Sequence, residues 1–500
     1  MSSTSQAQPV AIPIAFSRGM GLSWPLVLGL AAFLVPVAAG WGLRDPDTYW
    51  HIAAGRWMLA HGAVLTHDPF SFTMHGAPWI AHEWGAELLI AAIYRFAGWA
   101  GLVFLAAACF GATVAYLLRF LLARMEPLHA VLFTFLAGSM LLPSLLARPH
   151  ELVWPLTAVW VGTLVAASEE HRAPPGWLLG VMLLWANLHA SYILGLGIAV
   201  VMAVDSVVDA ASGRRALAGR WLAFILASVV CVVLNPQGLR LLIFPFRLLG
   251  MTSLDYIREW QPPNLQHPQI LSLWLVVILG LAFIGRIRLR LMRNVLLLGL
   301  LFMALQHMRN IALLGLIAPF ILAKPIAELW RRLPRSGRDA AGLDRLLASL
   351  ARPARRITGS VAIVLAAVLA GVILNITRPH PPGSAAPRAA LAALLSRGAG
   401  RRILNDYGFG GYLIFRGIPV FVDGRADLYG DAFLQRMVAA LSLAPGAHLQ
   451  ALLGRYRITG ILLRPGWPAV RLLNLMPGWQ RVYADKVAVA YVRRFEAGTQ

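Results

Sequence analysis

Residues 24–51 read WPLVLGLAAFLVPVAAGWGLRDPDTYWH, and the change of character at Arg44 within this stretch decides the fold. Residues 24–43 are uncharged and mainly apolar, and a helix of about 20 such residues is long enough to cross a membrane. A cleavable signal peptide has a shorter apolar core of about 7–15 residues. Two carboxylates, Asp45 and Asp47, follow at once. The stretch therefore predicts a first membrane helix that ends at an acidic surface segment.

The composition of the whole chain is that of a membrane protein. Of its 500 residues, 58% are hydrophobic and 13% are charged, whereas soluble domains average about 25% charged residues. This low charge excludes a soluble protein, and the apolar runs predict about eleven membrane helices. The predicted spans are 24–43, 99–122, 128–146, 150–167, 177–190, 192–210, 221–235, 270–285, 291–305, 307–323 and 358–376.

The arginines set the expected orientation. The net charge is +22, but the basic residues stand between apolar runs, as on the cytoplasmic side of membrane proteins. We therefore expect no nucleic-acid binding. The loop richest in arginine is 331–356, and Arg214, Arg215 and residues 286–290 fall on the same side. With this side inside, the N-terminal tail 1–23 is cytoplasmic and the C-terminus lies outside.

The first outer loop, residues 44–98, is far longer than a connection requires. Residues 48–61 predict a helix that lies along the membrane, and residues 81–96 predict a second such helix or a short re-entrant one. The loop also carries tryptophans suited to an interfacial aromatic belt. These are Trp50, Trp57, Trp79 and Trp84. A second outer loop, 236–269, contains Glu259.

The last part of the sequence predicts a small soluble α/β domain. Residues 379–383, PHPPG, form a stiff linker, and the short apolar runs after it are typical of buried strands. The expected strands are 403–404, 412–415, 419–422, 459–463 and 487–492, and the expected helices are 431–442 and 448–456. The expected organisation is a tail 1–23, a membrane domain 24–378 and a C-terminal domain 379–500 outside the membrane.

Under this topology, acids, histidines and amides gather at the outer ends of the helices, whereas the inner loops hold mainly arginine. Charged groups near a membrane need a pairing or functional reason. A common site built from several helix ends explains the asymmetry; the alternative is that helix ends are simply polar. The residues concerned are Asp45, Asp47, His51, His82, Glu83, Glu87, Arg148, His150, Glu151, Asn187, His189, Asn235, Gln237, Glu259, Gln306, His307, Arg309 and Asn310.

Asp45 and Asp47 are the candidate catalytic residues. Two carboxylates one residue apart either share a divalent metal ion, such as Mg²⁺ or Mn²⁺, or provide a general base and its orienting partner. A helix would place His51 on the same face as Asp47. The alternative is structural, with Asp47 capping the helix and His51 resting at the membrane surface.

Arg148 and Arg309 are the candidate ligands of a lipid phosphate, with His150 and His307 beside them. Guanidinium groups match phosphate oxygens, and arginines at outer helix ends run against the usual inside bias. The alternative is that these arginines pair with Glu83, Glu151 or Glu259. Supporting roles are expected for His51, His82, Glu83, Asn187, His189 and Glu259.

Three residues of the C-terminal domain complete the candidate set: Asp423, Arg425 and Asp427. They follow a predicted strand directly. In this position they would contact the acceptor of a transferred group. Turn chemistry and local ion pairing explain them equally well.

Several short motifs occur in order along the chain: DPDTYWH (45–51), HDPFSFT (67–73), AHEW (81–84), RPH (148–150), WANLH (185–189), NPQG (235–238), RN (309–310) and VDGRAD (422–427). With these motifs, the chain resembles a bacterial group of GT-C class membrane glycosyltransferases over residues 24–494. The resemblance implies many membrane helices, a large first outer loop with a catalytic acid, and polyprenyl-phosphate-linked sugar donors. Asp45 or Asp47 matches the acidic position.

The expected function is an inverting sugar transfer at the outer face of a bacterial inner membrane, to a lipid, glycan or protein acceptor. One aspartate would deprotonate the acceptor, while Arg148 or Arg309 would stabilise the departing lipid phosphate. No soluble cofactor is required. Three alternatives remain open: a lipid or glycan transporter or flippase, a polysaccharide polymerase or ligase, and a non-catalytic envelope assembly protein.

Overall fold

The computed structural model describes residues 22–285, 287–332, 350–351 and 355–494. Within these residues, seven helical stretches are long and apolar enough to cross a membrane. They are Trp84–Leu122 (α3), Pro127–Ser144 (α4 and the short η1), Pro149–Glu169 (α5 and α6), Tyr192–Asp209 (α8), Arg214–Val233 (α9), Met308–Arg331 (η4 and most of α13) and Arg356–Thr377 (α15). Four shorter apolar helices stand among them, α1 (Trp24–Ala39), α7 (Leu178–Leu188), α11 (Ile270–Gly285) and α12 (Leu291–Gln306).

Each of these stretches overlaps one predicted span, so the prediction of a polytopic helical membrane protein is confirmed. The closely spaced pair α7 and α8 is also present, separated only by residues 189–191. Most of the arginine-rich loop 331–356 and of the tail 1–23 falls at 333–349, 352–354 and 1–21, outside the described residues.

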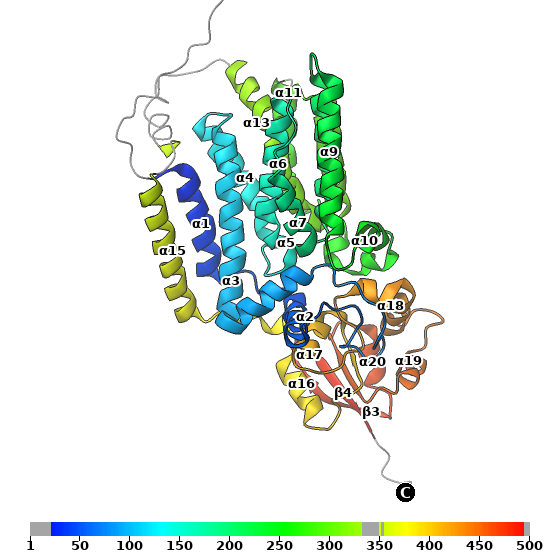
Figure 1. Cartoon of the computed structure of the whole chain (residues 1–500). Helices are drawn as coiled ribbons and strands as arrows, with labels where there is room; N and C mark the ends of the chain where they lie inside the picture. The colour runs from blue at the N-terminus through cyan, green and yellow to red at the C-terminus, as the bar shows by residue number, and fades with distance from the viewer. Residues whose placement is uncertain (1–21, 286, 333–349, 352–354, 495–500) are drawn as a thin grey trace, which may run out of the picture.

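The second predicted surface helix and the span after it form one bent helix, α3. The bend is at Gly98, whose φ of 56° and ψ of −148° are not helical. A side chain would disfavour this positive φ, so glycine suits the position. The segment before the bend runs across the ends of the membrane helices, and the segment after it continues into the bundle (Figure 1).

The first predicted surface helix is α2 (Asp47–His61), and it packs on α3. A β-carbon at Gly55 would overlap the backbone carbonyl of Glu87, so only glycine allows this close approach. The prediction that the tryptophans of the loop 44–98 form an interfacial aromatic belt is wrong for Trp50 and Trp79. Both are buried, because the C-terminal domain covers this part of the loop.

The C-terminal domain has a four-stranded sheet in the order β1-β2-β4-β3. β1 (Ile403–Asn405) runs parallel to β2 (Gly460–Leu463), and the remaining neighbours, β2 with β4 (Val489–Arg493) and β4 with β3 (Trp479–Ala484), are antiparallel. Five helices accompany the sheet: α16 (Arg388–Leu395), α17 (Gly410–Phe415), α18 (Ala426–Ser442), α19 (Leu449–Arg455) and α20 (Pro468–Leu473).

Three of the predicted strands and both predicted helices of this domain are present. The strand prediction for 412–415 is wrong, because these residues belong to helix α17. The run is apolar and buried, and a short apolar run of this kind does not distinguish a helix from a strand by periodicity. Residues 419–422 form only isolated bridges at Val420. β3 was not expected, since its side chains are mostly half-buried or exposed.

The loop 44–98 is attached to the C-terminal domain by backbone hydrogen bonds. Phe72 N–H donates to the carbonyl of Val420 over 3.0 Å, and Val420 N–H donates to the carbonyl of Phe70 over 3.1 Å. The Thr73 hydroxyl donates to the Phe421 carbonyl at 2.7 Å. The loop therefore lies between the membrane helices and the sheet (Figure 1).

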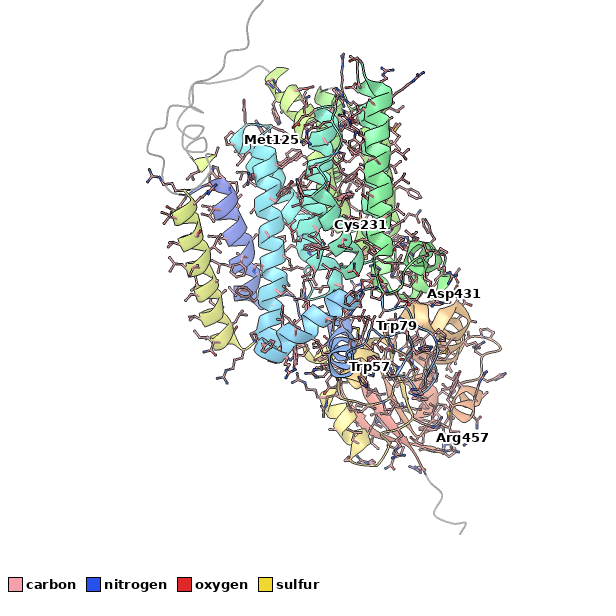
Figure 2. All side chains as sticks on the ribbon, viewed as in Figure 1. Trp57, Trp79, Met125, Cys231, Asp431 and Arg457 are labelled. Carbon is pink, nitrogen blue, oxygen red and sulfur yellow. The ribbon has the colours of Figure 1, made fainter. Side chains whose placement is uncertain are left out.

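The loop after α9 is attached to the same domain. It contains α10 (Arg240–Leu249) and the short helices η2 (Thr252–Tyr256) and η3 (Arg258–Trp260). The Asp431 carboxylate of α18 accepts the N–H groups of Thr252 and Ser253 at 3.1 and 2.9 Å, and Figure 2 marks Asp431 beside this loop. Both loops are thus positioned by one domain.

Candidate active site

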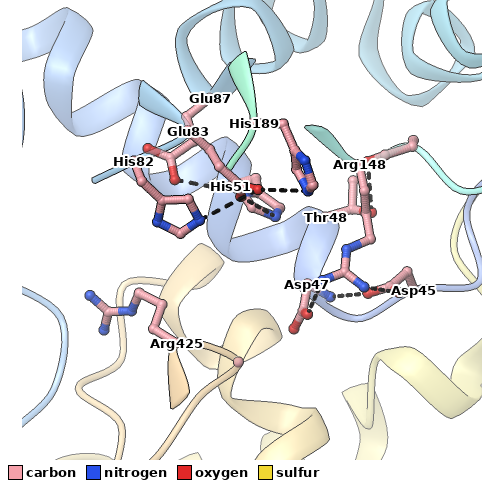
Figure 3. Close-up of polar contacts among 12 residues, drawn as sticks. Asp45, Asp47, Thr48, His51, His82, Glu83, Glu87, Arg148, His189 and Arg425 are labelled. Atoms are coloured by element: carbon pink, nitrogen blue, oxygen red, sulfur yellow. Dashed lines mark hydrogen bonds and ion pairs between the residues drawn. The ribbon is translucent and has the colours of Figure 1, made fainter. Parts of the chain in front are cut away.

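Asp45 and Asp47 share one partner, the guanidinium group of Arg148 (Figure 3). Arg148 Nη1 donates to Asp45 Oδ2 at 3.1 Å, and Nη2 donates to Asp47 Oδ2 at 2.9 Å. Asp45 Oδ1 also accepts the backbone N–H of Asp47 at 2.7 Å. Asp47 is the first residue of α2 and Pro46 is the N-cap, so Asp47 does not occupy the capping position.

The backbone around Arg148 is fixed to the end of the first helix. Ala147 N–H donates to the Gly42 carbonyl at 2.6 Å, and the Thr48 hydroxyl donates to the Ala147 carbonyl at 3.1 Å. These bonds explain why two segments far apart in the sequence meet here. The Arg148 guanidinium group bridges the two aspartates and supplies their countercharge.

Glu259 extends the network to a second arginine. Its two carboxylate oxygens accept separately, one from Arg148 Nη1 at 3.1 Å and the other from Arg309 Nη1 at 3.3 Å. Arg309 also lies 4.4 Å from the ring centre of Trp260. Pairing of both arginines with Glu259, the alternative raised by the sequence, is therefore present in the structure.

The pKa values of Asp47 and Glu259, two carboxylates of this network, shift in opposite directions. Burial raises the pKa of Asp47 to about 7, although Arg148 opposes the shift. Burial also disfavours the charge of Glu259, but Arg148 and Arg309 outweigh it and lower the pKa of Glu259 to about 2. Of these two carboxylates, Asp47 is therefore the one whose pKa lies near neutral pH.

The two histidines expected to assist the arginines bind backbone carbonyls instead. His150 Nε2 lies 3.1 Å from the Ser144 carbonyl oxygen, and His307 Nδ1 lies beside the Trp260 carbonyl oxygen. In this structure, His150 fixes the turn before α5 (Pro149–Leu152), and His307 fixes the loop that carries Glu259.

A second cluster lies one helical turn beyond Asp47, around His51, Glu83 and Glu87 (Figure 3). Ligand atoms of these three buried side chains all lie within 4.8 Å of one another. Glu83 also lies 3.6 Å from His82 Nε2 and 3.4 Å from His189 Nε2. The supporting histidines of the sequence analysis therefore surround Glu83, and His51 is buried rather than at the membrane surface.

Burial acts differently on the members of this second cluster. It lowers the pKa of His51 and of His189 to about 3, so both rings are neutral. Burial disfavours the charged forms of Glu83 and His82, but the opposite charge of each group stabilises the charged form of the other. The pKa of His82 rises to about 9, and the pKa of Glu83 falls below its usual range.

The Asn187 side chain joins the start of α3 to the segment after α9. Its Oδ1 accepts from Trp84 Nε1 at 2.9 Å and from Asn235 Nδ2 at 3.0 Å. These bonds connect the start of α3 with the ends of α7 and α9, which fixes the segment that carries Glu83.

Asp423 and Arg425 connect the C-terminal domain to the first loop. Arg425 lies 2.7 Å from Asp423 and 2.8 Å from Asp68, and all three side chains are completely buried. Asp427 is half-buried in this interface and accepts from Trp79 Nε1 at 3.1 Å. The ion-pairing explanation of these candidates therefore fits the geometry, and Asp68 is a partner that the sequence analysis gave no role.

Arg425 supplies a testable prediction about this interface. Replacing a buried arginine leaves its carboxylates unpaired, at a cost of about 3–5 kcal/mol. We expect Arg425→Met to lower the thermal unfolding midpoint of the purified protein and to expose the linker after α15 to protease. The matched control is Arg464→Met, because Arg464 is 48% exposed beside Asp406 and such a pair contributes about 0–1 kcal/mol. Equal stability of the two variants would contradict this role of Arg425.

The C-terminal domain also touches the first cluster through Gly424. A β-carbon at this position would overlap the Asp47 carboxylate, and the Tyr407 hydroxyl donates to the Gly424 carbonyl at 3.0 Å. The sequence motif at 422–427 and the turn that carries Tyr407 therefore both lie against Asp47, a contact that the sequence did not predict.

No family model matches this sequence, and no curated protein sequence matches it. Solved structures do match. The arabinofuranosyltransferase AftD from Mycobacteria superposes over 96% of this chain and 41% of its own, with 14% identity and a TM-score of 0.52. The fold is that of the GT-C glycosyltransferases.

A second GT-C structure agrees with this assignment. The archaeal oligosaccharyltransferase AglB from Archaeoglobus fulgidus, solved with an inhibitory peptide and a dolichol-phosphate, superposes over 95% of this chain and 75% of its own. The identity is 10% and the TM-score is 0.52. The apo form of an oligosaccharyltransferase from the same organism gives a TM-score of 0.50, with 11% identity, 88% of this chain and 69% of its own. The resemblance stated from the sequence motifs is thereby confirmed at the level of the fold.

Proposed function

We propose that this membrane protein is an inverting glycosyltransferase that moves a sugar from a polyprenyl-phosphate-linked donor to a lipid, glycan or protein acceptor. The observation that carries the proposal is the Asp47–Arg148–Glu259–Arg309 network at one end of the helical bundle. It combines a carboxylate that exchanges a proton near pH 7 with two arginines suited to a phosphate. The GT-C fold agrees with it, and AglB was solved with a dolichol-phosphate.

Asp47 is the proposed general base, and Asp45 is its positioning partner. A base works best when its pKa lies near the working pH, and burial brings Asp47 into that range. Asp45 accepts the Asp47 backbone N–H and shares Arg148 with it. As the new glycosidic bond forms, the proton of the acceptor hydroxyl passes to Asp47.

Arg148 and Arg309 are the proposed ligands of the leaving phosphate. Glu259 already places one carboxylate oxygen on each guanidinium group, and phosphate oxygens accept from guanidinium groups in the same way. A donor phosphate would therefore compete with Glu259 for the two arginines. As the bond between the sugar carbon and the phosphate oxygen breaks, their positive charge would stabilise the released polyprenyl phosphate.

We also propose the topology and the domain boundaries. Arg214 and Arg215 begin α9 at the end of the bundle opposite to the C-terminal domain (Figure 1). Because arginine is enriched on the cytoplasmic side, the membrane domain 24–378 would place residues 379–500 on the outer side of a bacterial inner membrane. The tail 1–23 would be cytoplasmic.

Reconstitution tests the proposed reaction. Purified protein in liposomes is supplied with polyprenyl-phosphate sugars and with acceptor extracts from the outer side of the membrane, and both products are followed by mass spectrometry. We expect one polyprenyl phosphate released for each sugar transferred. Movement of the intact donor across the bilayer without release of phosphate would instead indicate a flippase.

The pH dependence of this transfer follows from Asp47. Its raised pKa means that the fraction in the basic form increases as the pH rises through about 7. We therefore expect kcat/KM to increase about tenfold per pH unit below this point and to level off above it. Asp45 contributes to raising the pKa of Asp47, so Asp45→Asn should move the midpoint to lower pH. An unchanged midpoint in that variant would contradict the assignment.

A further inference from the structure

A second site stands out among the buried polar groups, separate from the Asp47–Arg148 network. His51 lies on α2, Glu83 directly before α3, and Glu87 in the first turn of α3. His51 and Glu87 are each 1% exposed, and Glu83 is 9% exposed. Imidazole and carboxylate groups together are the donor set that proteins use for divalent transition metals.

The polar atoms of this cluster lack the hydrogen bonds that buried groups normally have. In the part of the chain that the structure describes, neither ring nitrogen of His51 has a hydrogen-bond partner, and neither does Glu87 Oε2. The carboxylates stand 3.6 Å from Nδ1 and 3.9 Å from Nε2, too far for hydrogen bonds. Leaving such groups unsatisfied in the interior is costly, and in native proteins it calls for a ligand.

The dimensions of the cluster suit one ion. Atoms bound to one metal at about 2.0–2.2 Å stand about 3–4.4 Å apart. The candidate ligand atoms lie within 4.8 Å of one another, so their spacing is close to that of a bound set. The approach of α2 to α3 at Gly55 brings His51 and Glu87 together.

The surroundings also resemble those of a metal site. His189 and His82 approach Glu83 from outside the triad, at 3.4 and 3.6 Å. His189 Nδ1 lies 2.8 Å from the Ser191 hydroxyl, which fixes the ring. Groups that hold a liganding carboxylate in this way orient it toward the ion.

We propose that His51, Glu83 and Glu87 bind one divalent transition-metal ion, Zn²⁺ or Mn²⁺. The ion would tie α2 to α3, and α2 also carries Asp47, one helical turn before His51. It would therefore act as a positioning element for the start of α2. The site stands on its own residues and does not depend on the proposed sugar transfer.

Metal binding to the purified full-length protein tests this proposal without any donor or acceptor. The protein, prepared without a histidine tag, is treated with chelator, dialysed, and titrated calorimetrically with Zn²⁺, Mn²⁺ and Mg²⁺. Elemental analysis then gives the metal content. We expect one Zn²⁺ or Mn²⁺ per chain, with Mg²⁺ bound at least tenfold more weakly, and a higher unfolding midpoint with the bound ion.

Two variants and one control locate the site. Glu87→Gln keeps the shape of the side chain, and His51→Ala removes the imidazole; each should weaken binding at least tenfold. The control is His61→Ala, an exposed histidine on the same helix, which should bind as the wild type does. Absence of a stoichiometric transition metal, or full binding by folded Glu87→Gln and His51→Ala proteins, would overturn the proposal. Sugar transfer without bound metal would overturn only the positioning role.

Discussion

Asp47→Asn should reduce sugar transfer by about 10²–10⁴-fold, the range in which a general base contributes to a rate. The amide keeps the shape of the side chain and can still accept from Arg148 Nη2, which lies 2.9 Å from Asp47 Oδ2. What it loses is the ability to take the acceptor proton. We therefore expect a fall in kcat with little change in the KM for the donor, measured in proteoliposomes with equal amounts of protein.

Two comparison variants make this result specific. Asp45→Asn should lose much less activity, because Asp45 orients Asp47 and Arg148 rather than accepting the proton. Asp485→Asn changes an exposed acid at the hairpin of β3 and β4 and should match the wild type. If Asp45→Asn were the inactive variant and Asp47→Asn remained active, the roles of the two acids would have to be exchanged.

Arg148→Gln should have the second large effect, because one guanidinium group neutralises three carboxylates. Removing one partner of a buried ion pair costs about 3–5 kcal/mol, and loss of a donor that stabilises the leaving group costs about 10²–10³-fold in rate. Arg148 also opposes the rise in the pKa of Asp47. The pH midpoint of any remaining activity should therefore move to higher pH.

Arg148→Lys distinguishes the role of the charge from that of the forked geometry. A lysine keeps the charge but cannot place two nitrogens on Asp45 and Asp47 together. We expect a stable protein with a pH midpoint near that of the wild type and a rate at least tenfold lower. Wild-type activity in Arg148→Lys would contradict the need for a bridging guanidinium group.

The membrane helices were predictable from the sequence because the thickness of the bilayer fixes the length of an apolar run. The short elements of the C-terminal domain were not predictable in the same way. Residues 412–415 are an apolar run whose length suits either a strand or one helical turn. In the structure they form part of helix α17, which packs on α2.

The gathering of polar residues into two clusters was only partly predictable. Their common side of the membrane follows from the order of the spans, which places Asp45, Arg148 and Glu259 at the same ends of the helices. The pairing itself depends on contacts such as Ala147 with Gly42, which no local pattern encodes. The ion pair of Arg425 with Asp68 was beyond prediction for the same reason, since its partners come from opposite ends of the chain.

The most direct test of the central claim is glycan and glycolipid mass spectrometry on a strain that lacks this gene. The strain is complemented with the wild type, Asp45→Asn or Asp47→Asn at equal membrane levels. We predict that one sugar is missing from an envelope glycan or glycolipid, that its polyprenyl-phosphate donor accumulates, and that the wild type but not Asp47→Asn restores the product. Full restoration by Asp47→Asn would contradict a glycosyltransferase that uses this carboxylate as its base.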